Sequence, residues 1–251
     1  MSGLRVTLSG ADRTIARSVF ASGDWDPLLV GTVFDALDRW GHAYGGRTMV
    51  EVGANFGVYS LPAVVEYGFG RAIAYEPEPA AFALLTANVE RNDLADRVTV
   101  VQAALSSEPG ELLLRRGWLN AGDNRIVGRG DSGDQRTVAV RATTIDDEVA
   151  SGSIRLDEIG LVWLDVQGHE LEVLAGAATL LASDVPLVIE YSTSMMSTGA
   201  RAQLDELIAA NFTCFVDLGW AALTNRLRFQ PAAAVRDLAA GRAVETDLLL
   251  L

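Results

Sequence analysis

The chain has 251 residues, of which 49% are apolar and 21% are charged. This is the composition of an ordinary globular protein, which excludes disordered, collagen-like and coiled-coil classes, and the length suffices for one large α/β domain with a sizeable core. The formal net charge of -13 would repel a phosphate backbone, so we expect no nucleic-acid partner.

Several features bear on where the protein works. The single cysteine, Cys214, cannot form an internal disulfide, and the start of the chain lacks the basic and then apolar pattern of a signal peptide. We therefore expect a cytoplasmic protein. No apolar run approaches the roughly 20 residues that cross a bilayer, so no membrane partner is expected.

We expect the terminal LLLL to pack or to pair as a strand. The sequence leaves the oligomeric state open, a homodimer included.

The first predicted element is a helix over residues 26–40, with Asp26 as its cap and Pro27 at its first position. We interpret residues 1–46 as an N-terminal helical cap that closes one end of the site. Residues 47–251 then form the core of the same single domain.

From residue 48 onward, short apolar runs typical of strands alternate with segments that have helical spacing of apolar residues. The predicted strands cover 48–53, 72–78, 98–105, 161–168 and 186–192, and strands at 214–217 and near 226–230 would add an antiparallel edge. The predicted helices cover 80–91, 170–183 and 200–211. This pattern predicts an α/β fold with a doubly wound, mostly parallel, seven-stranded sheet and helices on both faces.

The span 108–159 departs from this alternation. Its segments 110–116 and 135–149 have the composition of strands, and they flank a loop rich in Gly, Asp and Asn. We interpret it as an inserted β-hairpin, which either supplies a lid or substrate surface or is a solvated hairpin with no role in a site.

The stretch VEVGANFGVYS contains the first candidate site residues. Glu51 ends the first predicted strand, and Gly53, Asn55 and Gly57 follow it. In a doubly wound sheet, ligands bind outside the carboxyl ends of the strands. Asn55 stands where a GxGxxG motif needs its second glycine, so a pyrophosphate would be crowded. Glu51 would instead attract a cationic ligand such as S-adenosylmethionine, which carries a sulfonium and an ammonium group.

Two later strand ends fit the same ligand. Glu76 ends the second strand roughly 20 residues after the glycines, where a carboxylate accepts hydrogen bonds from both ribose hydroxyls. Gln102, Ala103 and Ala104 end the third strand, where small residues leave room for a flat adenine and Gln102 is available to its polar edge. Each residue alone is equally well a surface acid or a packing alanine, but the ordered set favours a nucleoside cofactor.

The sequence resembles the FkbM-type S-adenosylmethionine-dependent methyltransferases through VEVGANFGVYS, AYEPEPAAFALLTANVERN, VQAALSS, ATTIDDEV and LVWLDVQGHELEVLAGAATLL, in that order. Members of that family have the class I Rossmann-like fold and mostly methylate hydroxyl groups of sugars, polyketides and other secondary metabolites. The match covers roughly residues 51–191, so substrate identity is not carried over.

The resemblance also implies roles for individual residues. The first strand end would line the methionine part of the cofactor, Glu76 would hold the ribose, and the third strand end would border the adenine. The predicted cofactor-binding set is Glu51, Gly53, Ala54, Asn55, Gly57, Tyr59, Glu76, Pro77, Gln102, Ala103, Asp165 and Gln167. Gln167 stands where many members have a glutamate, which removes one candidate base or metal ligand.

Methyl transfer to an alcohol requires alignment of the reactants and removal of the hydroxyl proton. His169 follows the fourth predicted strand of the core, and we predict it as the base, with Asp165 positioning the substrate or orienting the imidazole. Alternatively, His169 caps the following helix or contacts the cofactor without proton transfer. A divalent metal such as magnesium, held by Asp165, Glu190 and a nearby carboxylate, is a further alternative. No metal ligand is predicted.

The leading hypothesis is therefore an O-methyltransferase that acts on a small hydroxylated metabolite. An NAD-dependent oxidoreductase would share the sheet and Glu76, but the missing middle glycine argues against it. A cofactor-binding module without turnover is the third hypothesis, because Gln167 departs from the common glutamate. Methylation of amino groups in nucleic acid or glutamine is set aside, because the site after the fourth strand reads LDVQGH instead of Asn or Asp followed by two prolines and an aromatic residue.

Overall fold

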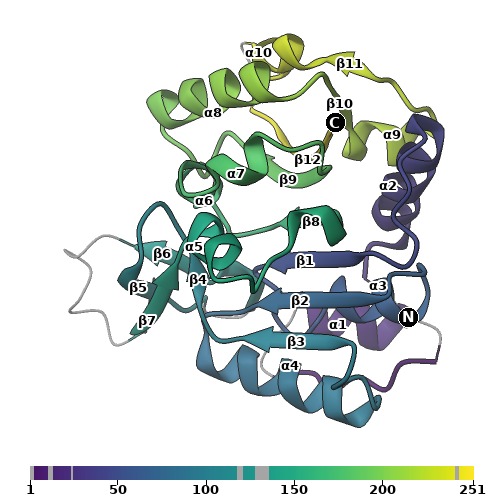
Figure 1. Ribbon diagram of the computed structural model, residues 1–251, viewed down its shortest axis with the longest axis vertical. Helices are drawn as coiled ribbons and strands as arrows, with labels where there is room; N and C mark the ends of the chain where they lie inside the picture. Colours follow the sequence, from purple (N-terminus) through teal and green to yellow (C-terminus); the bar gives the residue numbers. More distant parts are fainter. Residues whose placement is uncertain (1–2, 11–13, 24, 118–120, 128–135, 241–242) are drawn as a thin grey trace.

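The computed structural model describes residues 3–10, 14–23, 25–117, 121–127, 136–240 and 243–251 (Figure 1). The Gly- and Asp-rich part of the predicted insertion loop, residues 128–135, lies outside the described residues. No helix within the described residues is long and apolar enough to cross a bilayer. The cytoplasmic location and the absence of a nucleic-acid partner stay predictions.

The main sheet has eight strands among the described residues, in the order β11-β10-β12-β9-β8-β1-β2-β3. The strands are β1 (Thr48–Val52), β2 (Arg71–Tyr75), β3 (Val98–Val101), β8 (Ile159–Leu164), β9 (Leu187–Ser192), β10 (Cys214–Asp217), β11 (Gln230–Pro231) and β12 (Glu245–Leu250). β1, β2, β3, β8 and β9 are parallel, which confirms the doubly wound α/β class. The strand order reverses between β1 and β8, and ligands bind at such a point.

The antiparallel strand differs from the prediction. β12 pairs antiparallel with both β9 and β10, so β10 runs in the same direction as the parallel strands. The physical reason is burial: Leu248, Leu249 and Leu250 are all fully buried, as in a strand that is covered on both faces. The terminal leucines therefore form an inner strand, and the edge is the two-residue β11 instead of a strand over 226–230.

Helices cover both faces of this sheet. They are α1 (Ile15–Ser22), α2 (Pro27–Trp40), α3 (Ser60–Val65), α4 (Pro79–Arg91), α5 (Ile145–Ala150), α6 (Glu170–Ala175), α7 (Ala178–Leu181), α8 (Thr198–Asn211), α9 (Leu218–Thr224) and α10 (Val235–Leu238). One core combines Met49 and Trp163 with α2, α3, α4 and α9. The other combines Val50 and Val162 with α5 to α8 and α10. Alternate residues of a strand thus enter opposite cores, as the pleat requires.

One predicted helix has different bounds. The single helix expected over 170–183 is divided into α6 and α7 around Gly176. Asp146 N donates to Gly176 O, and the Asp146 carboxylate accepts from Ala178 N and Thr179 N, so contacts from α5 cap the start of α7. A Cβ atom on Gly176 would also collide with the backbone carbonyl of Ser106.

The insertion is larger than the predicted hairpin. It forms a second sheet in the order β4-β7-β5-β6, with β4 (Ala104–Leu105), β5 (Gly110–Arg115), β6 (Arg125–Val127) and β7 (Thr137–Thr143). The predicted strand over 135–149 ends at Thr143, because the Thr144 side chain accepts a hydrogen bond from Asp147 N and caps α5. In Figure 1 this sheet lies on the side toward which the arrowheads of β1, β2 and β3 point.

Candidate functional site

A cleft of about 740 Å³, its open mouth included, lies at the carboxyl ends of β1, β2 and β8. Nine of the predicted site residues line it, namely Gly53, Asn55, Tyr59, Glu76, Pro77, Ala103, Asp165, Gln167 and His169. Glu51, Ala54, Gly57 and Gln102 do not form its wall.

The turn after β1 depends on two glycines. Gly53 has a φ of +87°, and a Cβ there would collide with the carbonyl oxygen of Asp165, so only glycine lets the ends of β1 and β8 approach this closely. Gly57 has a φ of +93°, and a Cβ would come within 2.7 Å of Leu61 in α3. Asn55, between them, adopts a left-handed φ of +51°. The sequence pattern therefore shapes the cleft wall.

Glu51 stabilises this turn through hydrogen bonds to the start of α3. Its carboxylate accepts hydrogen bonds from Tyr59 N at 3.0 Å and Ser60 N at 2.8 Å, at the start of α3. The side chain is 1% exposed, and burial raises its pKa to about 7. The structure thus places Glu51 on the helix amides and not on the cleft wall, because the strand end points it under the turn.

Glu76 lies on the cleft wall at the end of β2. Its Oε2 accepts from Asn55 N and its Oε1 accepts from Glu78 N, both at 2.8 Å. Burial is the largest cause that raises its pKa to about 7. The two backbone amides hold the carboxylate in one orientation beside the glycine turn.

The third strand end is only partly in the site. Ala103 is fully buried and lines the cleft, whereas Gln102 is exposed. β3 ends at Val101, and Ala103 N donates to Val101 O, so this tight turn directs Gln102 to solvent. The predicted contact of Gln102 with an adenine edge therefore has no counterpart in the cleft wall.

Asp165, after β8, belongs to a group of acids that the Gln167 amide contacts. The Gln167 amide Nε2 donates to Asp165 Oδ1 at 2.9 Å and to Glu190 Oε2 at 3.0 Å. Burial raises the pKa of Asp165. Burial, and next the charge of Asp165, raise the pKa of Glu190 to about 9 and that of Asp247 to about 8. In the part of the chain that the structure describes, no group of three or more His, Cys, Asp or Glu side chains is arranged to hold a metal ion.

His169 has neighbours that the sequence did not indicate. Its Nε2 lies 2.9 Å from Ser106 Oγ, and its Nδ1 lies 3.7 Å from Glu172 Oε2. Burial lowers its pKa. Its side chain makes no capping hydrogen bond to α6. Ser106 and Glu172, and not Asp165, therefore orient the imidazole.

Segments outside the parallel core complete the cleft. Leu114, Asn124 and Ile126 come from the second sheet and its β5–β6 connection, and Ile15 and Trp25 come from the N-terminal region. The N-terminal region thus closes the cleft through α1 and Trp25, while α2 packs on the sheet. Trp25 Nε1 also donates to the Tyr59 hydroxyl at 3.2 Å.

A model of the methyltransferase FkbM domain matches residues 51–212. The chain is 31% identical over 160 residues to the 31-O-demethyl-FK506 methyltransferase FkbM of Streptomyces tacrolimicus, an alignment that covers 52% of this chain and 59% of that protein. It is 28% identical over 153 residues to the methyltransferase sdnD of Sordaria araneosa, covering 51% and 59%. It is 28% identical over 141 residues to the hexuronic acid methyltransferase AglP of Haloferax volcanii, covering 56% and 54%. The chain thus spans somewhat more than half the length of these relatives.

Solved structures share the fold. The human methyltransferase 10 domain containing protein aligns with a TM-score of 0.50 at 14% identity, over 99% of this chain and 89% of that one. The N-terminal domain of human METTL16 aligns with a TM-score of 0.50 at 12% identity, over 99% and 75%. The predicted methyltransferase fold class is confirmed.

Proposed function

The chain belongs to the methyltransferase FkbM domain family, and we propose that it transfers a methyl group from S-adenosylmethionine to a hydroxyl group of a small metabolite. One observation of the site carries this proposal. Two carboxylates, Glu76 and Asp165, line the same cleft, and no Lys or Arg is among the described residues of its wall. Such a wall suits a cationic ligand with hydroxyl groups and repels the pyrophosphate of a dinucleotide.

The residues present fit this cofactor. Glu76, held by two backbone amides, has the position from which a carboxylate accepts from ribose hydroxyls. Ala103, Leu114 and Ile126 offer small and apolar surfaces for a flat base. The turn from Gly53 to Asn55 and the aromatic pair Trp25 and Tyr59 would surround the methionine part. When bound, the cofactor supplies an activated methyl group on a sulfonium.

The geometry favours Asp165 over His169 as the proton acceptor. Both ring nitrogens of His169 face side chains of the protein, Ser106 and Glu172. Asp165 uses Oδ1 to accept from Gln167, and no described residue donates to its Oδ2. A carboxylate whose pKa is raised by burial binds a proton more readily than an exposed one. In this account, Asp165 Oδ2 receives the hydroxyl proton of the acceptor, and Ser106 holds His169 in the wall of the same cleft.

The relatives support the hydroxyl as the acceptor group. The name of one of them specifies 31-O-demethyl-FK506, in which an oxygen is the acceptor, and the name of another specifies a hexuronic acid. A sugar, polyketide or similar secondary metabolite is the corresponding proposal for this chain.

The test is methyl transfer from S-adenosylmethionine labelled in its methyl group, with a panel of hydroxylated sugars and polyketides. Label should appear in an ether that resists alkaline hydrolysis, and Asp165→Asn should lose most of the turnover while His169→Gln keeps a larger part of it. A chain that binds the cofactor but labels none of these acceptors would favour a binding module, and label in amines alone would contradict O-methylation.

A further inference from the structure

The second sheet brings an amide side chain to the cleft that the sequence did not single out. Asn124 lies between η1 (Ala121–Asp123) and β6, and it lines the cleft. Its Oδ1 accepts a hydrogen bond from Gly117 N at 3.0 Å, which ties the two ends of the β5–β6 connection together. Because a backbone amide can only donate, this bond fixes which end of the carboxamide is the oxygen.

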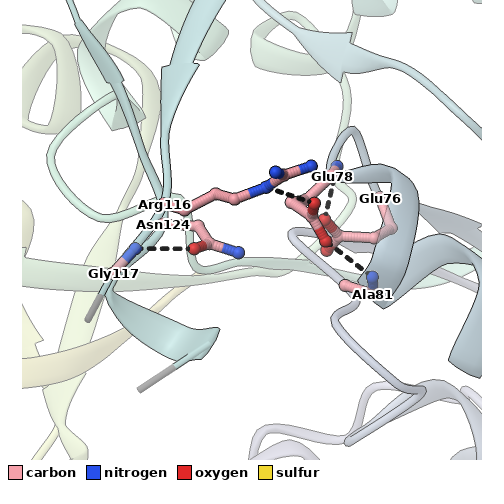
Figure 2. A network of polar contacts seen from close by, with 6 residues as sticks. All are labelled: Glu76, Glu78, Ala81, Arg116, Gly117 and Asn124. Atoms are coloured by element: carbon pink, nitrogen blue, oxygen red, sulfur yellow. Dashed lines mark hydrogen bonds and ion pairs between the residues drawn. The ribbon is translucent and has the colours of Figure 1, made fainter. Parts of the chain in front are cut away.

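The nitrogen of the same carboxamide remains available. Figure 2 shows Asn124 Nδ2 on the side away from Gly117, directed toward the gap that separates the second sheet from Glu76 and Glu78. This nitrogen makes no hydrogen bond to a described residue. Its two N–H groups are therefore donors that face a cleft whose opposite wall contains the acceptor Glu76.

An ion pair fixes the distance between these two walls. Arg116 Nε donates to Glu78 Oε1 at 2.8 Å, and Glu78 Oε2 accepts from Ala81 N at the start of α4 (Figure 2). Glu78 N in turn donates to Glu76 Oε1. The Glu78 side chain is 5% exposed and that of Arg116 is 46% exposed, so the carboxylate end of the pair is firmly held. The end of β5 is thereby connected to the turn that carries Glu76.

We infer that Asn124 donates a hydrogen bond to the adenosine half of the cofactor, so that the inserted sheet belongs to the cofactor site. This inference rests on the proposed function. Adenine ring nitrogens and ribose oxygens are acceptors, which matches the N–H groups of Asn124 that no described residue accepts. Leu114 and Ile126, on the strands that flank Asn124, supply apolar surface at the same wall. The inserted sheet then recognises the nucleoside, and acceptor choice lies elsewhere.

The experiment compares Asn124→Asp with the wild type in calorimetric titrations with S-adenosylhomocysteine and with adenosine. Aspartate keeps an oxygen that accepts from Gly117 N, but it has a second oxygen in place of Nδ2. The hydrogen bond within the β5–β6 connection is therefore kept, while the proposed hydrogen bond to the ligand is lost. Both ligands should bind about tenfold more weakly, as expected for one lost hydrogen bond to a buried ligand. Asn124→Ala should weaken both ligands similarly. Glu111→Gln, an exposed position on β5 that does not line the cleft, is the matched control and should keep wild-type Kd values.

Three results would overturn the inference. The first is a wild-type Kd for either ligand in both Asn124 variants, provided that their melting temperatures match the control. The second is a wild-type chain that binds S-adenosylhomocysteine but has no affinity for adenosine at millimolar concentration. The third is a wild-type chain that binds neither ligand, and this result alone would also overturn the proposed function.

Discussion

Gln167 illustrates how one residue sets the chemistry of the cleft. Its backbone has a left-handed φ of +55°, which a residue with a Cβ adopts only when its surroundings require it. In that conformation its two N–H groups reach Asp165 and Glu190, so one neutral amide connects the two acidic side chains. A glutamate at this position would add a third acidic group and offer no such donors.

Replacing Gln167 by methionine should change the pH dependence of turnover. The amide donates to the Asp165 carboxylate and lowers its pKa, against the upward effect of burial. Without this donor the pKa rises further, so the acidic limb of kcat/KM should move to higher pH, with turnover recovering toward the wild-type value above that limb. The charge of Asp165 raises the pKa of Glu51, Tyr59, Glu76, Glu170, Glu190 and Asp247, and none of these groups is a cation that could replace the donor. His169 lines the same cleft, and burial lowers its pKa, which disfavours the imidazolium there. An unchanged limb in the variant would remove Asp165 from the role of base.

At the scale of the elements, the division of α6 from α7 shows a long-range contact overriding a local pattern. The sequence from 170 to 183 has helical spacing throughout, yet Gly176 lies against the backbone of Ser106. The same approach places Ser106 beside His169 in the cleft. Ser106, a residue of the site, thus lies between Gly176 and His169.

Gly176→Ala should destabilise the fold, since the new Cβ would have to displace the Ser106 carbonyl. We expect a loss of about 1–3 kcal/mol in the free energy of unfolding, as for overpacked sites, measured by urea denaturation. Gly199→Ala in α8 is the matched control, because its nearest neighbour would be 3.9 Å away. This control should be neutral or stabilise the chain by roughly 0.5–1 kcal/mol. Equal stability of the two variants would mean that the close approach at Gly176 does not constrain the fold.

The sequence predicted features that depend on neighbouring residues and missed those that depend on residues distant in the chain. Strand ends such as Glu76 and Asp165 could be located, because the alternation of strand-like and helix-like segments identifies the strands, and the carboxyl ends of parallel strands lie at one edge of the sheet. Ser106 and Arg116 could not, because each acquires its role by meeting a residue far along the chain. Asn124 could not, because it reaches the cleft only through the pairing of the second sheet. The inner position of β12 was missed for the same reason, since pairing order is not local.

For the molecule as a whole, the excess of acids has a consequence for stability. Burial raises the pKa of five carboxyl groups to between about 7 and about 9: Glu51, Glu76, Glu170, Glu190 and Asp247. In the unfolded chain these groups titrate near pH 4. The folded chain therefore binds more protons than the unfolded chain between about pH 4 and 9, and its stability should fall as the pH rises through that window.

Calorimetric melting of the ligand-free protein from pH 5.5 to pH 9 tests this expectation. The melting temperature should decrease by several degrees across the range, and Glu190→Gln should make the decrease shallower because it removes the group with the highest of these pKa values. A melting temperature that is constant or increases with pH would contradict the assignment of buried, protonated acids.

We propose above all that the cleft at the ends of β1, β2 and β8 accepts a nucleoside that carries an amino-acid part. The most direct measurement is a pair of titrations of the purified chain, one with S-adenosylhomocysteine and one with NAD. We predict one equivalent of S-adenosylhomocysteine bound per chain, weakened at least tenfold by Glu76→Gln, and no binding of NAD. Saturable binding of NAD together with no binding of S-adenosylhomocysteine would contradict the account.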